Sequence, residues 1–194
     1  MDCMITELTG RRAKLVPMHT DHMEGLFEAG NNAQIWTYMP YKIETMNDMK
    51  RLVDEALAAR GRGEEFPFVI VDQNTGKIVG SSRFLNVSQA NRTLEIGWTW
   101  YHPTVWRTSI NTECKYLLLH HCFGTLSTIR VEFKTDARNI RSQRAIERLG
   151  AVKEGVRRNH RILPDGYIRD SVYYSIIAQE WDAVKVRLQH LLKK

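Results

Sequence analysis

The sequence predicts a mixed α/β (α+β) fold in one domain, residues 1–194, and three features support this prediction. Hydrophobic residues recur at helical spacing in the first third of the chain. Three β-rich runs separated by turn residues follow, and strands then alternate with helices towards the C-terminus. The length of 194 residues, of which 43% are hydrophobic and 26% charged, suits one substantial hydrophobic core.

The first half of the chain is predicted to form a strand, helical segments and a three-stranded meander. Met49 and Leu52 recur at helical spacing after Thr45, and Gly61 follows, so a helix is expected between Thr45 and Gly61. Gly97 falls inside a β-rich run, where glycine often marks a bulge or the close approach of another backbone. The strands expected here are 12–17, 66–71, 77–85 and 94–101, and the helices are 20–30, 33–39 and 45–61.

The second half is predicted to alternate between strands and helices. Asn139 is suited to the first position of a short helix, which Gly150 would end in the C-cap position. The strands expected here are 129–135, 152–158 and 168–176, and the helices are 110–126, 139–149 and 180–192. The two halves together give about seven strands, flanked by helices.

Charge is distributed unevenly along the chain. Residues 1–100 contain 11 Lys/Arg and 13 Asp/Glu, whereas residues 101–194 contain 17 Lys/Arg and 9 Asp/Glu. The C-terminal half is therefore basic and predicts an anionic ligand or partner. Nucleic acid, an acidic protein and a phosphorylated cofactor all satisfy this prediction.

The cysteines and the N-terminal residues predict a cytoplasmic location. The three cysteines are Cys3, Cys114 and Cys122, and this odd, sparse count is typical of a reducing compartment. The first residues lack the basic and then apolar order of a signal peptide. No apolar run approaches the ~18 residues of a membrane helix, so no membrane association is expected. His120 and His121 diverge on a helix, and no metal site is predicted.

Two polar segments each lie where a predicted strand ends and a helix begins. The first is 99–113, in which Arg107 and the hydroxyls of Thr108, Ser109 and Thr112 precede or open the helix. Helix N-termini bear unpaired amides and bind phosphate groups. A Ser/Thr cap beside an arginine is also common where no ligand binds, so this segment alone leaves capping and anion binding open.

The second polar segment, 134–150, repeats the arrangement. Asn139 and Ser142 lie at the expected helix start, and Arg141, Arg144 and Arg148 share one helical face. This face is either a solvated basic surface or a surface for phosphate. Two such segments in succession favour phosphate binding.

These residues resemble the GCN5-related N-acetyltransferases, in particular the branch that acetylates ribosomal-protein N-termini. The resemblance extends from Arg12 to Trp181. The matching motifs are Glu95-Ile96-Gly97-Trp98 of the central strand, Pro103–Glu113 of the acetyl-CoA pyrophosphate loop, Asn139-x-x-Ser142 with Arg148–Ala151, and Asp165-Gly166, Asp170 and Tyr173–Ser175 of a closing hairpin. The family's fold has a mixed, mostly antiparallel sheet.

The resemblance implies a direct transfer of the acetyl group from acetyl-CoA to a primary amine. Glu95 is the candidate base, with a structural carboxylate or a water chain as the alternatives. Ser142 is the candidate proton donor, and both Asn139 and Ser142 also suit a purely capping role. The residues expected to contact acetyl-CoA are Trp100, Tyr101, Arg107, Thr108, Ser109, Ile110, Asn111, Thr112, Asn139 and Ser142.

The pyrophosphate loop departs from the family pattern Gln/Arg-x-x-Gly-x-Gly/Ala. Trp106 occupies the first position, and Ser109 and Asn111 occupy the two small positions. Glycine lets the backbone approach a ligand closely, whereas Ser and Asn can donate hydrogen bonds themselves. A modified phosphate cradle and a loss of cofactor binding are both consistent with this change.

Several functional alternatives stay open. The chain could be a catalytically weak or inactive CoA-binding module, or a basic nucleic-acid-associated domain, although no base-reading motif is present. The acceptor could be a protein N-terminus or a small molecule such as a polyamine or an aminoglycoside. The resemblance also implies possible ribosome association and a possible homodimer.

Overall fold

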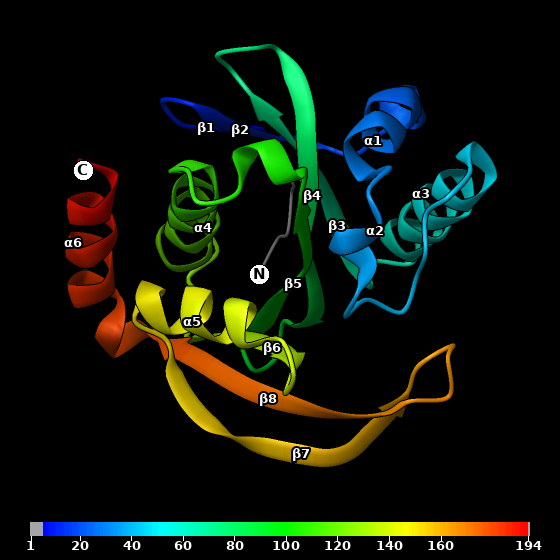
Figure 1. Ribbon diagram of the computed structural model, residues 1–194. Helices are drawn as coiled ribbons and strands as arrows, with labels where there is room; N and C mark the ends of the chain where they lie inside the picture. The colour runs from blue at the N-terminus through cyan, green and yellow to red at the C-terminus, as the bar shows by residue number, and fades with distance from the viewer. Residues whose placement is uncertain (1–5, 194) are drawn as a thin grey trace.

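The computed structural model describes residues 6–193, which form an eight-stranded sheet covered by helices (Figure 1). The strand order is β1-β2-β3-β4-β5-β6-β8-β7. Neighbouring strands are antiparallel except for β5 and β6, which are parallel. The strands are β1 (Leu8–Thr9), β2 (Ala13–Pro17), β3 (Glu65–Asp72), β4 (Lys77–Ser88), β5 (Thr93–Tyr101), β6 (Arg130–Asp136), β7 (Val152–Ile162) and β8 (Ile168–Ile177).

The mixed α/β fold predicted from the sequence is therefore confirmed, with one strand more than expected. The additional strand is β1, which contains two residues and is too short to produce a recognisable periodicity. β7 is also longer than expected and reaches Ile162.

Helices cover both faces of the sheet (Figure 1). On one face α1 (Met23–Gly30) contacts β4 and α3 (Met46–Gly61) contacts β3, with α2 (Ala33–Trp36) between them in the chain. On the other face α4 (Ile110–His120) contacts β2 and α6 (Trp181–Leu192), and α5 (Ile140–Leu149) contacts β6 and α6.

Two hydrophobic clusters fill the two sides of the sheet. Leu94, Ile96 and Phe133 belong to the cluster that contains the apolar residues of α4, α5 and α6. Trp100 belongs to the cluster formed with α1, α2 and α3. Because successive residues of a strand point to opposite faces, Glu95, between Leu94 and Ile96, points away from α4.

The helix boundaries follow local signals in the sequence. The Thr45 hydroxyl accepts a hydrogen bond from the Asp48 amide at 3.2 Å, and the Asp48 carboxylate accepts one from the Thr45 amide at 2.9 Å. Gly150 ends α5 with φ of 107°, a left-handed conformation that favours glycine. The helix expected over 110–126 differs from the observed one at its C-terminal end. The α-helix ends at His120, and a π-helical turn continues to Thr125.

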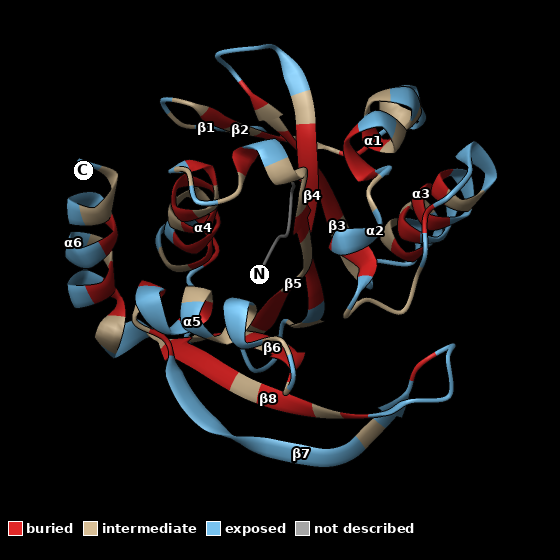
Figure 2. Ribbon diagram, viewed as in Figure 1, coloured by how far each residue is buried: buried red, intermediate tan, exposed pale blue. Residues whose placement is uncertain are grey.

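β7 and β8 form a long hairpin at one end of the sheet. Nearly every residue of β7 is exposed, whereas most of β8 is buried (Figure 2). β7 is an edge strand, so one side of its backbone has no strand partner among the described residues.

Candidate active site

β5 and β6 separate from each other along their length. Their parallel pairing comprises three residue pairs, which begin at Thr93 and Arg130 and end at Glu95 and Glu132. Both strands continue beyond this point without pairing to each other in the described chain. We call this stretch, residues 96–101 of β5 and 133–136 of β6, the splay.

A bulge in β5 lies at the start of the splay. Gly97 pairs with Arg83, whereas Trp100 pairs with Ser81, so β5 has one residue more than β4 in this interval. The strained residue of the bulge is Trp98, whose φ of 51° lies in the left-handed region. The bulge expected from the glycine is confirmed, and it begins directly after Gly97.

Glu95 belongs to the last residue pair that joins β5 and β6 before they separate. Its side chain is buried, with the residue 2% exposed, and its Oε2 accepts hydrogen bonds from Asn86 Nδ2 at 2.8 Å and Lys134 Nζ at 2.9 Å. A Cβ on Gly97 would lie 3.0 Å from Glu95 Oε1, so the glycine leaves room for this carboxylate. The candidate base is therefore an oriented and ion-paired carboxylate.

The segment before α4 presents cationic and amide groups. Arg107 is exposed and has a left-handed φ of 62°. The Ile110 amide donates to Thr108 Oγ1 at 3.4 Å, and the first backbone bond of the helix runs from the Glu113 amide to the Ser109 carbonyl at 2.9 Å. Helix geometry leaves the amides of residues 111 and 112 without an intrahelical acceptor.

Serine can replace glycine at position 109 because the backbone conformation there is an ordinary one. Ser109 has φ of −69° and ψ of −17°, which any residue adopts in a helical turn. Asn111 lies inside the first turn of α4. The loop therefore keeps its helix N-terminus without the glycines of the family pattern.

The start of α5 lies beside the start of α4. Asn139 Oδ1 accepts a hydrogen bond from the Ser142 amide at 3.0 Å, which confirms the predicted cap. The guanidinium carbon of Arg141 lies 3.9 Å from the centre of the Trp106 ring, and Trp106 Nε1 donates to the Tyr101 carbonyl at 2.8 Å. This stack brings the two predicted phosphate-binding segments together.

Four of the residues expected to contact the cofactor turn their side chains inwards. Ile110 and Trp100 are in the hydrophobic clusters, and the Tyr101 hydroxyl is buried. The Thr112 hydroxyl accepts a hydrogen bond from Arg148 Nη2 at 2.9 Å. Any contact of these four residues with a ligand must therefore use backbone atoms.

The buried contacts of two charged residues of α4 were not predicted from the sequence. The Glu113 carboxylate accepts hydrogen bonds from backbone amides of Arg12 at 3.0 Å and Ala13 at 2.8 Å, and so fixes the start of β2. The Lys115 ammonium donates to Thr99 Oγ1 at 2.7 Å within the core. The sequence did contain a signal for the burial of Lys115. The residue lies beside Cys114 and one turn before Leu118 and Leu119, within an apolar helical face.

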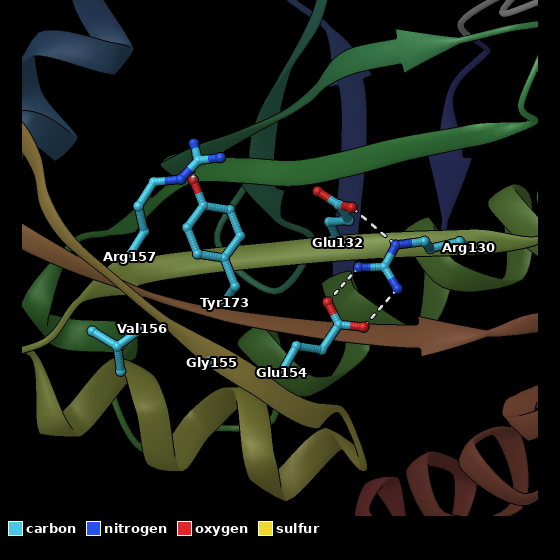
Figure 3. Close-up of a pocket in the computed structure, with 7 residues that line it drawn as sticks. All are labelled: Arg130, Glu132, Glu154, Gly155, Val156, Arg157 and Tyr173. Carbon is cyan, nitrogen blue, oxygen red and sulfur yellow. Dashed lines mark hydrogen bonds and ion pairs between the residues drawn. The ribbon is translucent and has the colours of Figure 1, made fainter.

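A charged pocket lies on the face of the sheet to which Glu95 points. Arg130, Glu132 and Lys134 alternate with core residues of β6 and therefore share that face, and Lys134 is the residue that pairs with Glu95. Arg130 forms ion pairs with both Glu132 and Glu154 (Figure 3). The volume is about 540 Å³, and the lining residues are Arg130, Glu132, Glu154, Gly155, Val156, Arg157 and Tyr173.

Figure 3 places the Arg157 side chain beside the Tyr173 ring at the other end of this pocket. The guanidinium carbon lies 5.4 Å from the ring centre. His160 contacts the same tyrosine and donates to or accepts from the Ser171 hydroxyl at 2.9 Å. Burial and the neighbouring arginines, Arg157 first, lower the pKa of His160. This part of the hairpin therefore retains a positive charge through Arg157.

Two further findings concern residues 6–193 as a whole. No group of three His, Cys, Asp or Glu side chains in this range is arranged to hold a metal ion. None of the helices described there is long and apolar enough to cross a membrane.

Comparison with known proteins agrees with this geometry. Residues 12–152 match the model of the acetyltransferase (GNAT) domain. The chain is 31% identical over 110 residues to Bacillus subtilis YdaF, which is named as a presumed ribosomal N-acetyltransferase; the match covers 57% of this chain and 59% of YdaF.

Solved structures are also similar. A GCN5-related N-acetyltransferase from Brucella melitensis is 28% identical, with a TM-score of 0.90 over 96% of this chain and 85% of that one. Mycobacterium smegmatis RimJ in complex with CoA-disulfide shares the fold at 22% identity, with a TM-score of 0.79 over 92% of this chain and 88% of that one. The chain thus belongs to the GNAT acetyltransferase family and is an acetyl-CoA-dependent N-acetyltransferase.

Proposed function

We propose that this enzyme acetylates the N-terminal amine of a protein, which attacks the acetyl group directly while both substrates are bound. The observation that carries the proposal is the open, charged pocket on the face of Glu95, bordered by the exposed edge strand β7. An edge strand offers backbone groups that can pair with an extended peptide.

The residues around the splay fit acetyl-CoA. The open amides at the start of α4 and the exposed guanidinium of Arg107 are the donors that a pyrophosphate needs. We expect the backbone of Trp100 and Tyr101, which lies along the splay, to bind the amides of pantetheine, and Asn139 lies at the start of α5 to orient them. The Tyr101 carbonyl already accepts a hydrogen bond from Trp106 Nε1. Acetyl-CoA supplies an acetyl group that is activated as a thioester.

The charges of the pocket favour a peptide over a polycationic small molecule. Glu132 and Glu154 are both already paired with Arg130, and Arg157 adds a further positive charge. Polyamines and aminoglycosides need several unpaired carboxylates, whereas an N-terminal peptide presents one amine and a backbone. The acceptor amine must also be neutral in order to attack.

Each side chain has a proposed task in the transfer. Glu95, oriented by Asn86 and Lys134, accepts the proton that the attacking amine loses. Ser142, held at the first turn of α5 by Asn139, donates a proton to the leaving sulfur. Ribosome association and homodimer formation stay predictions.

Replacement of Asn139 by alanine is expected to weaken acetyl-CoA binding about fivefold or more. The change removes the amide oxygen that orders the first turn of α5, which costs about 1 kcal/mol of stability, together with the proposed contact to the cofactor. Calorimetric titration measures the binding constant, and acetyl-CoA should raise the Tm of the wild-type protein.

Asn32→Ala is a matched control, because Asn32 caps α2 in the same way, accepting from the Gln34 amide at 3.0 Å. This variant should lose stability but keep its affinity for acetyl-CoA. Equal affinity in Asn139→Ala and Asn32→Ala would refute the assignment of Asn139, and no effect of acetyl-CoA on the wild-type Tm would refute the proposed site.

A further inference from the structure

Lys115 spans the splay from the side of α4. The residue is 6% exposed, and its ammonium donates to Thr99 Oγ1 of β5 at 2.7 Å. The same nitrogen lies 5.8 Å from the centre of the Phe133 ring of β6. Thr99 and Phe133 belong to the two strands that part, so the ammonium lies beside the stretch where they are unpaired.

Polar groups without a formal charge surround this ammonium in the part of the chain that the structure describes. It faces the Thr99 hydroxyl, which also shares a hydrogen bond with Ser82 Oγ at 2.8 Å, and its titratable neighbours are the thiols of Cys114 and Cys122. No ion pair within residues 6–193 includes Lys115.

A buried ammonium without a carboxylate destabilises a fold, and such groups concentrate at functional sites. Burial lowers the pKa of Lys115 to about 8, so the side chain is still mostly an ammonium at neutral pH. Glu95 points to the opposite face of β5, so the splay has a carboxylate on one side and an ammonium on the other.

We propose that Lys115 is a catalytic group whose ammonium faces the thioester end of acetyl-CoA and stabilises the negative charge that the transfer leaves on sulfur. This inference rests on the proposed function. In the transfer the C–N bond to the amine forms and the C–S bond breaks, and the electron pair of that bond leaves on sulfur. Glu95 takes the proton of the amine and releases it to solvent. Ser142 gives sulfur its proton and regains one from solvent, and Lys115 keeps its own.

The test uses the thiol of bound CoA as the reporter. Its ionisation is followed by the ultraviolet absorbance of the thiolate as the pH is raised, in wild type and in Lys115→Met. A nearby ammonium favours the thiolate, so the variant should raise the pKa of the bound thiol by about one unit or more. Desulfo-CoA should bind equally to both proteins, and kcat of the variant should fall about tenfold with little change in KM for acetyl-CoA.

Two further variants control this measurement. Lys77→Met makes the same chemical change at an exposed position at the start of β4 and should leave the bound thiol unchanged. Thr99→Val removes the hydroxyl that holds the ammonium but keeps Lys115, and should produce a smaller rise in the same direction. Methionine replaces a buried charge with an apolar side chain of similar length, so the Tm of Lys115→Met should not fall.

Each outcome has a definite meaning. If Lys115→Met and Thr99→Val bind CoA and its thiol ionises as in the wild type, Lys115 is a structural residue and the inference is wrong. If the wild-type protein binds neither CoA nor acetyl-CoA, the proposed cofactor site fails and the role of Lys115 fails with it. If CoA binds and its thiol ionises at a higher pH in Lys115→Met and Thr99→Val but not in Lys77→Met, the proposed cofactor site and the role of Lys115 both hold.

Discussion

Replacing Glu113 with alanine is expected to lower the free energy of unfolding by about 3 kcal/mol or more. The carboxylate is 7% exposed and accepts hydrogen bonds from the backbone amides of Arg11, Arg12 and Ala13. Each buried amide that loses its acceptor costs about 1–3 kcal/mol. These bonds also fix the turn between β1 and β2, where a Cβ on Gly10 would lie 2.6 Å from Glu113 Oε1.

Urea denaturation measures this loss, and two variants calibrate it. Glu113→Gln keeps one acceptor oxygen and should lose less stability than Glu113→Ala. Glu28→Ala removes an exposed carboxylate from α1 and should change stability by no more than about 0.5 kcal/mol. If Glu113→Ala were as stable as Glu28→Ala, the amides of residues 11–13 would not depend on this carboxylate.

Replacing Glu95 with glutamine is expected to lower kcat about 100-fold. Glutamine keeps the size and the hydrogen bond from Asn86 but cannot accept a proton from the attacking amine. The loss should be largest at moderate pH, where few acceptor amines are neutral without help from a base. The pH dependence of kcat and of kcat/KM, measured with one acceptor peptide, gives this comparison.

Lys134→Met separates chemistry from structure at this position. It breaks the same ion pair, which joins Lys134 Nζ to Glu95 Oε2 at 2.9 Å, but leaves the carboxylate in place. If Glu95 is the base, Lys134→Met should lose far less activity than Glu95→Gln. Equal losses in the two variants, with an unaltered pH–rate profile, would make Glu95 a structural partner of Lys134 and assign the base elsewhere.

Local signals predicted most helix ends and strands. Thr45, Asn139 and Gly150 act within a few residues of their own positions, so their capping roles are legible in the sequence. Gly97 likewise predicted a bulge, although the strain lies at Trp98. The π-helical turn after His120 leaves no such signal, because its residues suit a longer α-helix equally well.

Contacts between distant residues were not predictable in this way. Glu113 binds the backbone about a hundred positions away, and Lys134 meets Glu95 from a different strand. The sequence shows that residue 115 is a lysine, but only the fold shows that its side chain is buried and lies against Thr99. The resemblance to a family therefore identified the central strand and the two helix starts, whereas the partners of the charged groups required the structure.

Acetyl transfer to a panel of amines distinguishes a peptide N-terminus from a small-molecule acceptor. The panel includes peptides with free N-termini, the same peptides with blocked N-termini, polyamines and aminoglycosides, and the release of CoA thiol is followed for each. We expect release of CoA thiol that depends on the free N-terminus of a peptide and is lost when that amine is blocked. Release with polyamines or aminoglycosides alone, or with none of the amines, would contradict this expectation.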